Sequence, residues 1–194
     1  YQGREAIVVW GAEHLTIHNA ADGKLFWTCE GFNPDQRSNW VQVASSVLAG
    51  DMAIVPYGRG KHVAGIELSG DGDVTQSNRK CTLTGTGSFV PTPAVKDGKV
   101  YVLGDRGSVT CLDSRTGNKL WYGQFPKNRA SYYSSPTVAD GKLYASREDG
   151  VIMVAGITEG FRFLAENNMG ERIIATTVPV RDQLLIRGEK HLFC

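Results

Sequence analysis

Residues 93–121 read PAVKDGKVYVLGDRGSVTCLDSRTGNKLW, and residues 136–164 read PTVADGKLYASREDGVIMVAGITEGFRFL. The two segments align without a gap, 43 positions apart, and share the opening Pro-x-Val-x-Asp-Gly-Lys-x-Tyr. In this alignment Leu164 falls where Trp121 stands. Because an internal repeat marks one structural unit per copy, it is the first guide to the fold.

Rougher copies extend the repeat in both directions along the chain. The first copy begins near residue 6 and lacks the opening segment, and the second begins at residue 45 and carries extra residues at 70–75. In the second copy, Cys81 takes the place of the closing Trp, and a fifth copy stops at Cys194. The repeat divides the chain into units over residues 1–44, 45–92, 93–135, 136–176 and 177–194.

The period and the strand pattern of the repeat indicate one architecture. The matched glycines Gly50, Gly98 and Gly141 are 48 and 43 residues apart, a spacing typical of a four-stranded propeller blade. Short runs of Val, Ile, Leu and Tyr alternate with Asp-Gly and Thr-Gly turns, and no long segment has helical periodicity. Runs such as residues 151–154 are apolar at successive positions, which suits strands covered on both faces. The sequence therefore predicts an all-β fold, a β-propeller forming a partial ring of about four to five four-stranded blades.

Three of these blades should be complete, with leading strands near residues 46–55, 93–103 and 136–146, and incomplete units should flank them. The chain opens at Tyr1 without a Met or an apolar leader, so we expect it to be the C-terminal half of a longer chain. Incomplete end units would leave apolar blade faces uncovered. We therefore expect self-association, as a two-fold dimer, or packing on upstream blades.

The pattern Ser-Pro-x-Val-x-Asp-Gly-x-Val-Tyr-Val, followed by Gly-x-Val-x-x-Leu-Asp-x-x-Thr-Gly-x-x-Leu-Trp, resembles the PQQ-like (pyrroloquinoline quinone) β-propeller repeat. Residues 88–121 and 131–164 carry it best. The family includes quinoprotein dehydrogenases, an outer-membrane assembly lipoprotein and secreted or kinase-attached propellers, and the chain looks most like the last group, common in planctomycete-type bacteria. The resemblance implies a periplasmic or extracellular location. It also implies that the closing Trp27 and Trp121 dock against neighbouring blades.

Composition excludes several classes of partner and site. The formal net charge of +1 gives no reason to expect nucleic acid, and no apolar run is long enough to span a membrane. The four cysteines show no CxxC spacing, and the sequence leaves their disulfide pairing open. They are Cys29, Cys81, Cys111 and Cys194.

The resembled dehydrogenases need a calcium ion held by oxygen ligands and a pair of adjacent cysteines beside the quinone. This sequence has neither adjacent cysteines nor an acidic cluster, and it lacks a nucleophile elbow or phosphate loop. We therefore expect no catalytic residue, no metal and no cofactor in this chain. Two alternatives stay open: part of a PQQ-dependent dehydrogenase, where PQQ would be the cofactor, and an extracytoplasmic sensor domain attached to a kinase.

Two long loops carry the residue types that are favoured at binding surfaces. The loop over residues 30–40 contains Arg37 and Trp40, and the loop over residues 126–133 contains Arg129, Tyr132 and Tyr133. Arg, Trp and Tyr are enriched among residues that dominate binding energy. The leading hypothesis is a non-catalytic scaffold that binds a protein or a small ligand on this loop face.

Overall fold

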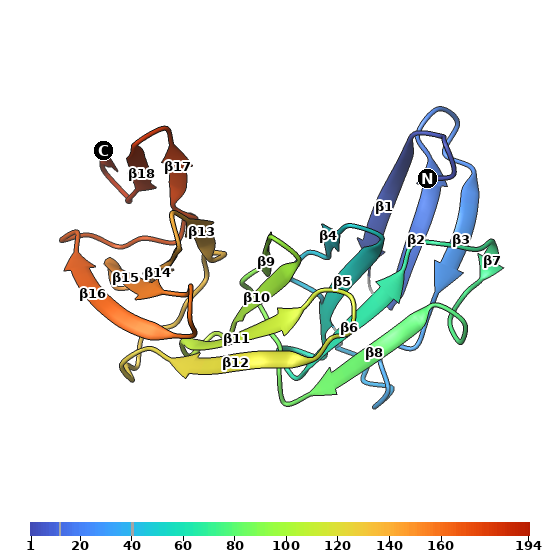
Figure 1. Ribbon diagram of the computed structural model, residues 1–194, viewed down its shortest axis with the longest axis horizontal. Coiled ribbons are helices and arrows are strands. Elements are labelled where there is room, and N and C mark those ends of the chain that lie inside the picture. The colour runs from blue at the N-terminus through green and yellow to red at the C-terminus, as the bar shows by residue number, and fades with distance from the viewer. Residues whose placement is uncertain (12, 40) are drawn as a thin grey trace.

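The computed structural model describes residues 1–11, 13–39 and 41–194. In this part of the chain all regular structure is β-strand, arranged as five sheets that follow one another in an arc (Figure 1). Apart from the short strand that joins the first sheet in parallel, each sheet has the up-and-down strand order of a propeller blade. The prediction of an all-β, partial propeller ring is confirmed.

Three blades are complete antiparallel sheets of four strands, and their first strands fall where the sequence predicted. Blade 2 consists of β4 (Val47–Ala49), β5 (Met52–Tyr57), β6 (His62–Glu67) and β8 (Arg79–Thr84). Blade 3 consists of β9 (Ala94–Lys96), β10 (Lys99–Leu103), β11 (Ser108–Asp113) and β12 (Lys119–Gln124). Blade 4 consists of β13 (Thr137–Ala139), β14 (Lys142–Arg147), β15 (Val151–Gly156) and β16 (Arg162–Asn168).

The two end blades differ from these three. Blade 1 consists of β1 (Ala6–Gly11), β2 (His14–Asn19) and β3 (Leu25–Cys29), and β7 (Gly72–Asp73) pairs in parallel with β3. The extra residues of the second repeat therefore extend the outer edge of blade 1, while an inner strand like β4 is absent from its described residues. Blade 5 has the three strands β17 (Val178–Val180), β18 (Gln183–Arg187) and β19 (Leu192–Phe193).

Hydroxyl side chains link the blades just before each inner strand. The N–H of Ser45 donates to Oγ1 of Thr92 at 3.0 Å, and the N–H of Thr92 donates to Oγ of Ser135 at 3.1 Å. The N–H of Ser135 continues the series to Oγ1 of Thr176 at 3.1 Å. A Ser or Thr recurs at this place because its hydroxyl satisfies a backbone donor of the preceding blade.

Strand register corrects one sequence alignment. In blades 1 to 4 the outer strand has a β-bulge, and the closing Trp position comes directly after it. Trp27 pairs with Ile17 in blade 1, and Trp121 pairs with Cys111 in blade 3. Cys81 occupies this position in blade 2, as predicted. In blade 4, however, Ala165 occupies it, opposite Val154, and the prediction of Leu164 is wrong.

The slip in blade 4 has a visible cause. The pair Leu112–Lys119 encloses six residues, whereas the equivalent pair Ala155–Phe163 encloses seven, so the β15–β16 connection is one residue longer in register. Phe161 lies in this connection. Its ring centroid lies 5.2 Å from that of Phe125 and 6.3 Å from that of Trp121. The added aromatic side chain thus packs back onto blade 3, and the strand after it shifts by one position.

The hydrophobic core lies between blades rather than within any one of them. Trp27 is fully buried in the cluster shared by blades 1 and 2, which confirms its docking position. Trp121 packs at the edge of the cluster shared by blades 3 and 4 and is only partly buried. Both indole rings lie where the resemblance placed them, but with unequal burial.

Among the described residues, the core cluster between blades 2 and 3 contains no aromatic side chain. The cluster between them is aliphatic, with Met52, Ile54 and Leu112 among its members. At the Trp position, the Sγ of Cys81 lies so close to Gly117 that a Cβ at residue 117 would collide with it. Gly117 also has a φ of 71°, which favours glycine, so this turn needs Gly for both reasons.

Candidate functional site: a basic loop face

The loops at one end of the arc are fastened to one another by backbone hydrogen bonds. The N–H of Tyr132 donates to the carbonyl of Asp105 at 3.0 Å, and the N–H of Glu148 donates to the carbonyl of Ser131 at 2.9 Å. The loop over residues 126–133, which joins blades 3 and 4, is therefore tied to the β10–β11 and β14–β15 turns. We call this end of the arc, with its inter-blade loops and these turns, the loop face.

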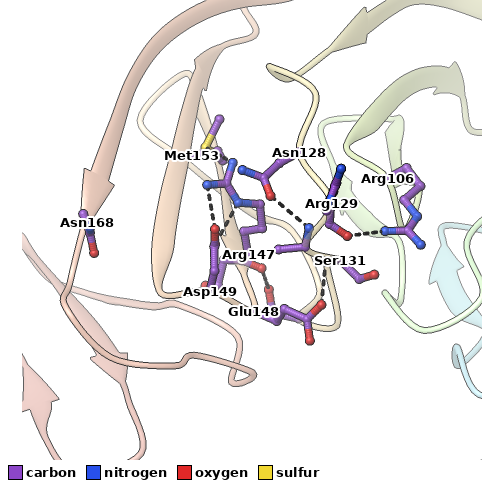
Figure 2. A network of polar contacts seen from close by, with 12 residues as sticks. Arg106, Asn128, Arg129, Ser131, Arg147, Glu148, Asp149, Met153 and Asn168 are labelled. Carbon is purple, nitrogen blue, oxygen red and sulfur yellow. Dashed lines mark hydrogen bonds and ion pairs between the residues drawn. The ribbon is translucent and has the colours of Figure 1, made fainter.

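Side chains complete the anchoring of the 126–133 loop (Figure 2). The guanidinium Nη1 of Arg106 donates to the carbonyl of Arg129 at 2.6 Å. The carboxylate of Glu148 accepts the N–H of Ser131 at 2.8 Å, and the Asn128 side chain accepts the N–H of Ala130 at 2.9 Å. The backbone of a loop held in this way has little conformational entropy left to lose on binding.

An ion pair between the buried Arg147 and the more exposed Asp149 lies beneath this loop. Arg147 is only 5% exposed, and its Nε and Nη2 donate to the two carboxylate oxygens of Asp149 at 2.8 and 3.0 Å (Figure 2). The two parallel bonds fix the guanidinium plane. The pair is a support for the loop face rather than a contact surface, because Arg147 is closed off from solvent.

Burial removes Tyr132 from the predicted binding surface. It is 2% exposed and stacks on Phe125 with ring centroids 6.0 Å apart. Burial raises the pKa of Tyr132 to about 12, an effect that the neighbouring Arg147 partly offsets. The expectation of an exposed contact at this position is wrong, because the Tyr ring fills the core between blades 3 and 4.

The other predicted residues fall into two groups. Arg129 and Tyr133 are exposed on the 126–133 loop, and Tyr133 is 40% exposed. Arg37 is exposed on the first loop, where its Nε pairs with Asp35 at 3.2 Å and its backbone bonds to Asn33. Trp40 lies outside the described residues. The structure thus keeps Arg129 and Tyr133 together and leaves Arg37 in a separate, self-bonded loop.

The loop face of blades 2 and 3 is basic, a property that the loop residues alone did not reveal. Exposed cations come from the β5–β6 turn, the β10–β11 turn and the 126–133 loop. They are Arg59, Lys61, Arg106, Lys127 and Arg129. Two acidic side chains between them are already engaged by backbone amides: Asp105 accepts the N–H groups of residues 89 and 90, and Glu148 accepts that of Ser131.

The described residues offer no metal site. No three His, Cys, Asp or Glu side chains among them gather into a group that could hold an ion. Three cysteines lie in different blades, and all four are free thiols in the structure.

Fold and site together define the class: an arc of a β-propeller with a structured basic loop face. The family model for "Outer membrane protein assembly factor BamB" matches residues 74–162. No curated protein matches the chain. In the part of the chain that the structure describes, no helix is long and apolar enough to cross a membrane.

Solved structures share this fold at low sequence identity. BamB from Moraxella catarrhalis is 19% identical with a TM-score of 0.68, and the match covers 93% of this chain and 50% of that one. The computationally designed Ika8 protein is 12% identical, also with a TM-score of 0.68, over 95% of this chain and 55% of that one. Quinohemoprotein alcohol dehydrogenase from Comamonas testosteroni is 14% identical with a TM-score of 0.67, over 84% and 34% of the two chains. The chain therefore spans about half the length of the first two.

Proposed function

We propose that this chain is a non-catalytic β-propeller domain that binds an acidic segment of another protein on its loop face. The observation that carries the proposal is the group of five exposed cations on the β5–β6 turn, the β10–β11 turn and the 126–133 loop, where the carboxylates of Asp105 and Glu148 already accept backbone N–H groups. Because these nearby carboxylates already accept backbone hydrogen bonds, the cations are available to attract a negatively charged partner. Tyr133 supplies an exposed aromatic side chain beside these cations.

The matched family is named for an assembly factor, which supports a protein as the partner. The match to this family model also supports a periplasmic or extracellular location. The similarity in fold to a quinohemoprotein alcohol dehydrogenase supports the dehydrogenase alternative. The described residues do not favour it, because no three His, Cys, Asp or Glu side chains among them form a group that could hold a metal ion. An absorption spectrum recorded after adding quinone and calcium tests that alternative directly, because bound quinone would give a new band. A kinase-attached sensor would be distinguished by sequence that adjoins this domain.

The test of the proposal measures the anisotropy of a fluorescent peptide rich in Asp and Glu as the protein is added. The double variant Lys127→Glu and Arg129→Glu should weaken binding by about tenfold or more, roughly 1.4 kcal/mol. The matched control is Arg115→Glu with Lys119→Glu, two exposed cations at the opposite end of the same blade. Equal losses in both double variants would show that net charge, and not the loop face, determines binding.

We also propose that the outer faces of the two end blades pack against a second copy of the chain. Ile7 and Val9 of blade 1 are 53% and 44% exposed, and Val178 and Val180 of blade 5 are 50% and 40% exposed. Aliphatic side chains side by side on a sheet face favour association. Light scattering should show a dimer that Val9→Lys or Val178→Lys dissociates. A monomer at high concentration would contradict this pairing.

A further inference from the structure

A crevice of about 260 Å³ opens between blades 2 and 3 at the loop face. Its walls come from the β5–β6 turn, the end of β8, β10, and the β10–β11 hairpin. Four glycines line it, so backbone rather than side chains forms much of the wall. The side chains that line it are Arg59, Thr86, Asp105, Arg106, Ser108, Thr110 and Tyr122, with Val102.

The neighbouring blade interfaces fill the corresponding space with aromatic rings. By strand register, Gly85 stands at the end of β8 where Phe125 stands at the end of β12. Phe125 packs on Tyr132 and Phe161 between blades 3 and 4, and Phe32 packs on Tyr57 at 5.3 Å between blades 1 and 2. The crevice lies at an interface where Gly85 stands in place of the aromatic residue.

Two guanidinium groups flank the opening. The Cζ of Arg59 lies 4.5 Å above the ring centroid of Phe89, which orients this side chain without using its hydrogen-bond donors. Arg106 uses Nη1 for the carbonyl of Arg129, and in the described chain no hydrogen bond involves its remaining guanidinium nitrogens. Both cations are thus held in place and keep donors for a ligand.

The acidic side chain in the crevice wall does not cancel these donors. The two carboxylate oxygens of Asp105 accept the N–H of Phe89 at 3.2 Å and the N–H of Val90 at 3.1 Å. These bonds hold the carboxylate on the backbone of the loop that leads to blade 3. With two cations against one carboxylate, the crevice side chains have an excess of positive charge.

Hydroxyl groups supply further donors inside the crevice. Thr86 and Thr110 are 7% and 5% exposed, and Ser108, the first residue of β11, also lines the crevice. Among the described residues, these three hydroxyls take part in no hydrogen bond. Nearby, the buried Oγ of Ser88 also has no hydrogen-bond partner in the described structure. Of these four hydroxyl oxygens, only that of Ser88 is fully buried. Those of Thr86, Ser108 and Thr110 are accessible from the crevice that their residues line, so they are free to bind a ligand or water.

We propose that this crevice binds a small ligand through an oxyanion group, a phosphate, sulfate or carboxylate. The oxyanion accepts charge-assisted hydrogen bonds from Arg59 and Arg106 at the rim and hydrogen bonds from Thr110, Ser108 and Thr86 within. Charge-assisted bonds to guanidinium are the strongest of these contacts. The volume exceeds that of one such ion, which leaves room for the small organic part of a ligand beside Tyr122. This site does not depend on the proposed protein partner.

The test is a titration of the ¹⁵N-labelled full chain with inorganic phosphate at constant ionic strength, followed by NMR. The amides of residues 85–87 and 104–110 should shift together, with a dissociation constant on the order of a millimolar for so small an ion. Arg59→Gln and Thr110→Val should each weaken binding several-fold to about tenfold. Arg115→Gln, at the other end of blade 3, should leave the dissociation constant unchanged.

Parallel titrations with sulfate and acetate identify the class of ligand. Tighter binding of the two tetrahedral ions points to a phosphate or sulfate ester, and tighter binding of acetate points to a carboxylate. Absence of shifts with all three ions overturns the proposal. So does an unchanged phosphate affinity in both Arg59→Gln and Thr110→Val, since Arg59 is an exposed turn residue whose replacement leaves the fold in place.

Discussion

Replacing Trp27 by Ala tests the packing between blades most severely. The indole is fully buried in the cluster shared by blades 1 and 2 and contacts residues from both sheets. Removing a buried aromatic side chain costs the transfer free energy and leaves a cavity, together about 3–5 kcal/mol. For a domain of this length, that loss in the free energy of unfolding lowers the melting temperature by roughly 6–20 °C.

The location of the effect is as informative as its size. In a repeat protein each unit contacts only its neighbours, so the loss should fall on blades 1 and 2. Hydrogen exchange read by mass spectrometry should show faster exchange in β1–β3 and β5–β6 and unchanged exchange in β14–β15. The control is Leu25→Ala on the same strand, where the side chain is 49% exposed. A melting temperature equal to that of Leu25→Ala would refute the docking role of Trp27.

Three further outcomes follow from burial. Trp121→Ala should cost less than Trp27→Ala, about 1–3 kcal/mol by thermal melting, because its indole is only partly buried. Since the pKa of Tyr132 is raised from 10.0 to about 12 in the folded state, stability should fall as the pH rises from 10 to 12, and Tyr132→Phe should reduce that loss; identical alkaline melting curves would contradict this. A thiol reagent should modify the exposed Cys194 quickly and the fully buried Cys29 and Cys111 only after unfolding, and rapid labelling of Cys111 would argue against the blade packing.

The repeat predicted the blades because its turns and apolar runs are local features. The Asp-Gly turn at residues 140–141 and the strand that begins at Lys142 lie where the 43-residue alignment placed them. The alignment failed at β16, where Phe161 adds a residue to the turn and Ala165 takes the Trp position. One more residue in the connection leaves the sequence pattern nearly intact, while the contact of Phe161 with the preceding blade 3 sets the register.

The candidate site was less accessible to prediction than the fold. Residue type placed Arg129 and Tyr133 on a surface correctly, but it could not tell that Tyr132, the adjacent residue, points into the core. The crevice joins residues 59, 86 and 106, which are far apart in sequence and have no shared motif. One signal was present: the Gly-Thr-Gly at residues 85–87 stands where the next repeat has Phe125.

The most direct measurement of the central claim is a hydrogen-exchange footprint of the chain bound to an acidic peptide. If the loop face is the binding surface, protection will appear at residues 58–61, 104–107 and 126–133. The turn over residues 114–118, at the opposite end of blade 3, will exchange as in the free protein. Protection confined to that opposite end, or to the faces of the end blades, would contradict the assignment of the loop face as the binding site.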